Sequence, residues 1–156
     1  MAELTLDVAR KILDVALAKA VEKKMKPLVI TVLDARGCVK VTAAQDGTSL
    51  LRSEIAHGKA YGALAMGMGS RALFQRAQEQ AYFVDAVNTL AQGRLVPVPG
   101  GVLIQKDGVL LGAIGVVRAD LDVGHDVGFR AVTFDANPLM VSGLTSPNAA
   151  ATCHHP

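Results

Sequence analysis

The sequence contains few aromatic residues and few cysteines, and both shortages restrict the kind of protein it encodes. Tryptophan is absent, and aromatic residues make up only 4% of the 156 positions. The core must therefore consist mainly of aliphatic side chains, alanine and methionine. The two cysteines, Cys38 and Cys153, stand far apart and do not form a disulfide framework. This cysteine usage favours a reducing, cytoplasmic setting.

Long apolar runs and clusters of one charge are also missing. No apolar run reaches the roughly 18 residues that a membrane-spanning helix needs. The first residues mix acids with apolar side chains, which is not the pattern of a secretory signal. The formal net charge is +2 without a basic stripe, so the charge gives no case for nucleic-acid binding. We expect neither a membrane nor a nucleic acid as partner.

Apolar residues are abundant, at 51% of the chain against 19% charged residues. This balance excludes a disordered chain and is enough for one sizeable core. We expect one domain over residues 1–145 and an extended C-terminal tail over residues 146–156. Alanine-rich helical segments in so short a chain also favour burial by self-association into a homo-oligomer.

Hydrophobic periodicity predicts helices that alternate with two β-hairpins. Because the strands of each hairpin join directly, the sheet is expected to be antiparallel and the fold class to be α+β. After residue 119 the pattern is compatible with a helix or with a strand. The predicted elements are a helix over 5–25, strands over 28–33 and 38–43, helical segments over 53–68 and 70–91, and strands over 102–106 and 109–117.

Four glycines lie inside these predicted elements. Gly112 and Gly115 interrupt the last strand, and Gly58 and Gly62 lie in the helical segment over 53–68. Each helical glycine costs on the order of 1 kcal/mol relative to alanine, and glycine in a strand removes a packing side chain. We expect these glycines to let the helix approach the sheet closely, or to leave a pocket between them.

Several polar residues are candidates for chemistry. His57, Tyr61, Leu64 and Met68 follow a spacing that places them on one face of a helix. A single histidine in such a place is more often a hydrogen-bonded packing residue than a ligand. Cys38 has no local base and is expected to be a buried structural residue. The final residues "CHHP" offer metal ligands on what looks like a tail, and "GMGSRA" follows a helix rather than the strand of a dinucleotide site.

Two stretches, "IAHGKAYGALAMGM" and "PGGVLIQKDGVLLGAIGV", resemble the GlcG/HbpS family, which includes the C-terminal domain of PduO-type proteins. The stretch "ITVLDARGCVKVTAAQDG" is similar to the first hairpin of that family. The resemblance covers residues 5 to 119. It implies a three-layer α-β-α fold around a central antiparallel sheet, similar to PAS and profilin domains, and assembly into dimers or octamers. The sequence departs from the family pattern at Leu103, where a proline is usual, and from Val117 onward.

The resemblance implies a small-molecule ligand, and haem is the first hypothesis. His57 would be the leading axial ligand of the iron, with His125 or Met68 as weaker candidates on the opposite side. The propionates would pair with Lys59, Arg118 or Arg71. The scarcity of aromatic residues to enclose a porphyrin counts against this hypothesis.

The alternative is a catabolic enzyme of lyase, isomerase or hydrolase type that needs no organic cofactor. Its substrate would be a hydroxyacid or an aromatic-derived acid. Arg118 would bind the carboxylate, and His57 or His125 would transfer a proton, with Asp126 beside His125. A third possibility is an assembly partner without chemistry. The residues expected to line the substrate site are Tyr61, Lys59, Gly100 and Gly101.

Overall fold

The computed structural model describes residues 3–119, 132–133 and 140–141, and all structural statements concern these residues. Its elements follow the predicted order of helix, hairpin, helices and hairpin. They are α1 (Leu6–Glu22), β1 (Leu28–Asp34), β2 (Val39–Ala44), α2 (Arg52–Met66), α3 (Ser70–Glu79), α4 (Ala81–Leu90), β3 (Gly101–Lys106), β4 (Val109–Arg118), β5 (Val132–Thr133) and β6 (Met140–Val141).

The strands form one sheet in the order β2-β1-β4-β3-β5-β6. The predicted α+β class is confirmed, because the four long strands pair antiparallel through the two hairpins and through β1 with β4. Two short strands extend the sheet beyond this prediction. The strand β5 pairs parallel with β3, and β6 pairs antiparallel with β5. The strands β1, β4 and β3 therefore each pair on both sides, and β1 and β4 are buried almost throughout.

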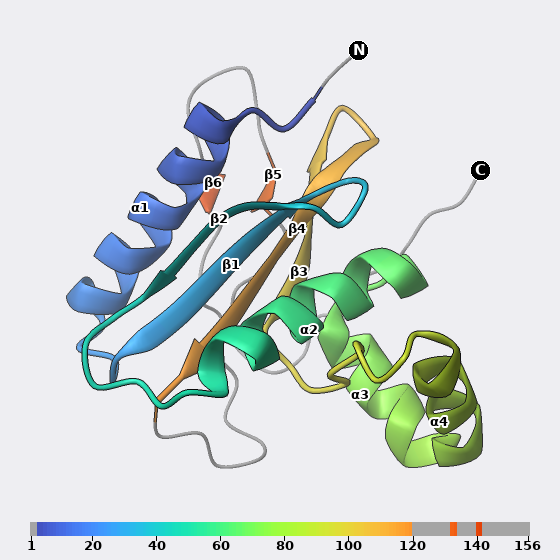
Figure 1. Ribbon diagram of the computed structural model, residues 1–156. Coiled ribbons are helices and arrows are strands. Elements are labelled where there is room, and N and C mark those ends of the chain that lie inside the picture. Colours follow the sequence, from blue (N-terminus) through green and yellow to red (C-terminus); the bar gives the residue numbers. More distant parts are fainter. Residues whose placement is uncertain (1–2, 120–131, 134–139, 142–156) are drawn as a thin grey trace.

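The sheet lies between α1 and α2, as Figure 1 shows. On one face, apolar side chains of α1 pack against Ile30, Val32 and Ile114. On the other face, alanines of α2 pack against Leu33 and Ala113. Alanine suits this second interface because its small side chain lets the helix axis lie close to the strands. The helix α3 packs beside α2, and α4 packs against α3 (Figure 1).

Local signals set where the helices begin and end, and α1 and α2 end earlier than periodicity suggested. The Thr5 side chain accepts the Val8 N–H and caps the start of α1. The helix α2 ends at Met66 because Gly67 adopts the left-handed conformation, with φ of 63°. The predicted helical segment over 70–91 is two helices, α3 and α4, separated at Gln80. No helix among the described residues is both long and apolar enough to cross a membrane.

The expectation that these glycines let α2 approach the sheet closely holds for Gly115 and not for the other three. Only Gly115 faces α2, where a side-chain carbon would collide with the carbonyl oxygen of Ala56. At Gly112 the same carbon would collide with the Leu33 carbonyl oxygen of the neighbouring strand, on the side of Leu4. Residues three apart on a strand point to opposite faces, which explains the difference. Gly58 and Gly62 also turn away from the sheet. Gly58 faces Val96 and the Arg94 carbonyl oxygen, and Gly62 faces Leu73 and Leu95.

Candidate functional site

The helix α2 carries most of the predicted site residues, and they lie on two of its flanks. On the first flank, the rings of His57 and Tyr61 stack with centroids 6.1 Å apart and planes 14° from parallel. Both side chains are half-buried. The turn between β1 and β2 borders this flank, because a side-chain carbon at Gly37 would lie 3.8 Å from the Tyr61 ring. The helical spacing of four residues that suggested a shared face is confirmed for this pair.

Arg94 completes the first flank, and sequence reasoning missed it. Its guanidinium lies over the Tyr61 ring, 4.5 Å from the centroid. Its Nε donates a hydrogen bond of 2.9 Å to the carbonyl oxygen of Ala91. No periodic pattern links a loop arginine to a helical tyrosine more than thirty residues away in the chain, so only the fold shows this contact. We call His57, Tyr61 and Arg94 the histidine flank.

The second flank of α2 is closed around Lys59. This side chain is 2% exposed, and its Nζ donates a hydrogen bond of 3.3 Å to the carbonyl oxygen of Val116. Burial, and secondarily the charge of Arg52, lowers the pKa of Lys59 from 10.5 to about 8. Its desolvated amine therefore loses its proton at a pH about two to three units lower than that at which an exposed lysine does.

Gly100 and Gly101 pack directly against this lysine. At Gly100 a side-chain carbon would lie 3.2 Å from Lys59 Nζ, and at Gly101 it would collide with the Lys59 carbonyl. The Gly101 N–H donates to Ser70 Oγ at 2.6 Å, which attaches the loop to the start of α3. Lys59, Gly100 and Gly101 thus lie together, on the flank of α2 opposite to Tyr61.

The remaining predicted residues lie elsewhere. Arg118 is half-buried at the end of β4 and pairs with Leu28 at the start of β1. Tyr61 contacts the turn beyond the other end of β1, which is about 20 Å away along the strand. Met68 packs against the apolar cluster of α3 and α4, and Arg71 is exposed in the first turn of α3.

Some of the predicted residues cannot be placed. His125, Asp126 and the terminal "CHHP" lie outside the described residues. Among the residues that are described, no group of three or more His, Cys, Asp or Glu side chains is placed to hold a metal ion.

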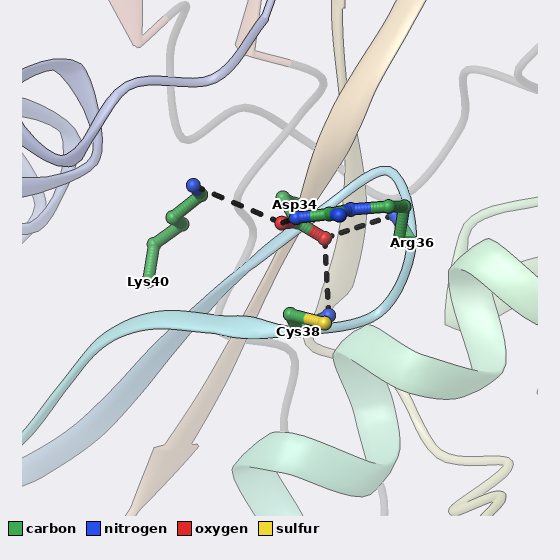
Figure 2. Close-up of polar contacts among 4 residues, drawn as sticks. All are labelled: Asp34, Arg36, Cys38 and Lys40. Atoms are coloured by element: carbon green, nitrogen blue, oxygen red, sulfur yellow. Dashed lines mark hydrogen bonds and ion pairs between the residues drawn. The ribbon is translucent and has the colours of Figure 1, made fainter.

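The turn beside the histidine flank is built around Asp34 (Figure 2). This carboxylate accepts the backbone N–H groups of Arg36 at 2.9 Å and Cys38 at 3.0 Å, and it pairs with Arg36 at 3.3 Å and Lys40 at 3.8 Å. Burial alone would raise the pKa of Asp34, but the hydrogen bonds from Cys38 and Arg36 outweigh it and lower that pKa. Cys38 is exposed, not buried as expected, because it stands where the edge strand β2 begins.

Comparison with known proteins identifies relatives over most of the chain. A family model described as "Haem degrading protein HbpS-like" matches residues 4–130. The corrinoid adenosyltransferase PduO of Salmonella typhimurium is 30% identical over 106 residues, which are 68% of this chain and 31% of that protein. The chain thus spans about a third of the length of the PduO proteins that it matches.

Two further relatives match over a larger share of their own length. An uncharacterized 15.0 kDa protein of Citrobacter freundii is 30% identical over 118 residues, which are 74% of this chain and 80% of that protein. The crystal structure of a PduOC:heme complex has a TM-score of 0.66 and 28% identity, and the match covers 74% of this chain and 83% of that one.

Proposed function

We propose, from the premise that this chain belongs to the HbpS-like family, that it binds haem or a related flat ligand on the histidine flank of α2. Two comparisons support the proposal. The family description names haem, and a structural relative at 28% identity is a haem complex. The observation in this chain that carries the proposal is the half-buried imidazole of His57, stacked on Tyr61 beside the cationic Arg94.

The residues of this flank fit the chemistry of haem. Imidazole is a common axial ligand of haem iron, and His57 is the only histidine among residues 3–119. The Tyr61 ring places an aromatic side chain beside the imidazole, and a guanidinium is the usual partner of a carboxylate. Bound haem would supply the iron chemistry. The chain itself would bind the iron through His57 and bind the macrocycle beside Tyr61.

The closed surroundings of Lys59 do not suit a propionate. This amine is buried and donates to Val116, on the flank opposite to His57. A propionate there would need both desolvation and displacement of the Gly100–Gly101 loop. We therefore assign Lys59 to the packing of α2 against the sheet.

A hemin titration tests the proposal. Wild-type protein should give a saturable shift of the Soret band with one hemin for each chain, and His57→Ala should lose that shift. His125→Ala removes the weaker axial candidate named above, and it should still give the saturable shift if His57 is the leading ligand. Equal, unsaturable spectra for the wild type and His57→Ala would overturn the assignment of His57. Loss of the shift in His125→Ala alone would move the ligand to that residue.

The catabolic-enzyme hypothesis remains the second candidate. It assigns the carboxylate of the substrate to Arg118. However, Arg118 pairs with Leu28 at the start of β1, whereas Tyr61 lies beside Gly37, beyond the end of that strand. It also relies on His125, which lies outside the described residues. The cluster of ring and guanidinium contacts around His57 therefore favours flat-ligand binding as the first candidate.

A further inference from the structure

We infer that Arg94 binds a carboxylate of the ligand on the histidine flank, and that this contact restricts the site to planar molecules that carry an acid group. The inference rests on the proposed function and adds the chemical class of its ligand. It starts from a residue that no sequence motif singles out.

Two contacts hold the Arg94 guanidinium in one orientation. Its Nε donates to the Ala91 carbonyl oxygen at 2.9 Å, and one of its faces covers the Tyr61 ring at 4.5 Å from the centroid. Neither contact uses the terminal nitrogens. An arginine that is already oriented loses less side-chain entropy when it binds, and its terminal N–H groups match the two oxygens of a carboxylate.

The backbone around Arg94 is also fixed relative to α2. The Val96 N–H donates to the Gly58 carbonyl oxygen at 3.2 Å, and the Leu95 N–H donates to Asn88 Oδ1 at 3.0 Å. Leu95 itself is buried in the apolar cluster of α3 and α4. These contacts attach the backbone next to the exposed Arg94 to α2, the helix that carries His57.

No carboxylate among the described residues competes for Arg94, because none forms an ion pair with it. The acid on the neighbouring turn, Asp34, is already paired with Arg36 and Lys40, as Figure 2 shows. Within the described part of the chain the terminal nitrogens of Arg94 thus form no ion pair with an acid, and a carboxylate of a ligand can accept hydrogen bonds from both of them in a charge-assisted pair.

The test compares hemin, which has two propionates, with hemin dimethyl ester, which has none. Wild-type protein should bind hemin at least about tenfold more tightly than the ester, which is the usual size of one charge-assisted hydrogen bond. Arg94→Gln should lose that preference and should keep its affinity for the ester. If Arg94 only supported Tyr61, the substitution would weaken both ligands equally, and that outcome would contradict the inference.

The chain offers a matched control in Arg76, which stacks on Phe83 at 5.1 Å on the α3–α4 hairpin. Arg76→Gln removes the same charge from the same kind of contact and should keep the preference for hemin. Equal binding of hemin and ester by the wild type would overturn the role of Arg94 while haem binding stands. Failure of both ligands to bind would overturn the proposed function, and the inference with it.

Discussion

Lys59 places an amine in the interior, where a charge is expensive to desolvate. One hydrogen bond to the Val116 carbonyl compensates for part of that cost. Gly100, some forty residues further along the chain, makes the space for its side chain, and Gly101 makes the space for its backbone carbonyl. This buried lysine gives the stability of the protein a distinctive dependence on pH.

The folded protein lowers the pKa of Lys59 to about 8, from 10.5. Between these values the unfolded chain binds a proton that the folded chain has released, so the free energy of unfolding rises with pH. We expect the rise to reach about 3 kcal/mol over this window. Urea unfolding at several pH values, compared with Lys59→Met, measures it, because the variant should lack the rise. Lys23→Met removes an exposed lysine and should retain it; an identical profile for Lys59→Met would contradict the assignment.

Sequence reasoning found the side chains whose partners are near in the chain and missed those whose partners are distant. The pairing of His57 with Tyr61 followed from helical spacing alone. The burial of Lys59 depends on Gly100 and Gly101, and the orientation of Arg94 depends on Tyr61. Contacts of this kind are formed by the packing of separate elements and leave no periodic trace.

The two glycines of α2 have different surroundings, which predicts opposite effects of the same substitution. A side-chain carbon at Gly58 would lie 2.5 Å from Val96 Cγ2 and 3.1 Å from the Arg94 carbonyl oxygen. Gly58→Ala should therefore destabilise the protein by about 1–3 kcal/mol, the usual cost of overpacking. At Gly62 the nearest atom is Leu73 Cδ2 at 3.4 Å, so Gly62→Ala should stabilise the helix by about 0.5–1 kcal/mol. Thermal unfolding of both variants measures the difference, and equal effects would contradict this description of α2.

Most helix and strand positions followed from local patterns, and the errors have physical causes. Each β-turn carried its own signal: residues 34–37 in the first hairpin and Asp107-Gly108 in the second. The error about Gly112 and Gly115 came from treating their proximity in the chain as proximity in space. The odd spacing between them already places them on different faces of the strand. The short β5 lies in a segment whose pattern was compatible with a helix or a strand. Its parallel pairing with β3 could not be predicted, since the two strands are distant in the chain.

The three-layer arrangement was implied by the resemblance to the GlcG/HbpS family, and the structure has α1 and α2 on the two faces of the sheet. A sheet whose central strands are apolar on both faces needs a covering layer on each side. The association of chains stays a prediction. Large apolar side chains remain exposed on one chain, among them Leu50 at 89%, Leu90 at 84% and Tyr82 at 75%. Exposed apolar surface of this kind favours contact between molecules.

We expect the protein in solution to be a homo-oligomer, between a dimer and an octamer. Sedimentation equilibrium or light scattering should therefore give a mass that is a multiple of the mass of one chain. The melting temperature should also rise with protein concentration, because association stabilises the folded state by mass action. A mass equal to that of one chain at every concentration would contradict this prediction, because the exposed leucines and Tyr82 would then face solvent.

The parallel pairing of β5 with β3 has a practical consequence for handling this protein. In the intact chain Val132 and Thr133 occupy hydrogen-bonding positions along β3. A recombinant version cut directly after Ala119 would make the six-residue β3 the edge of the sheet, in place of the two-residue β6. A longer unpaired edge invites pairing with other chains and aggregation. Expression of a shortened form should therefore retain the chain past Thr133, even where only the histidine flank is of interest.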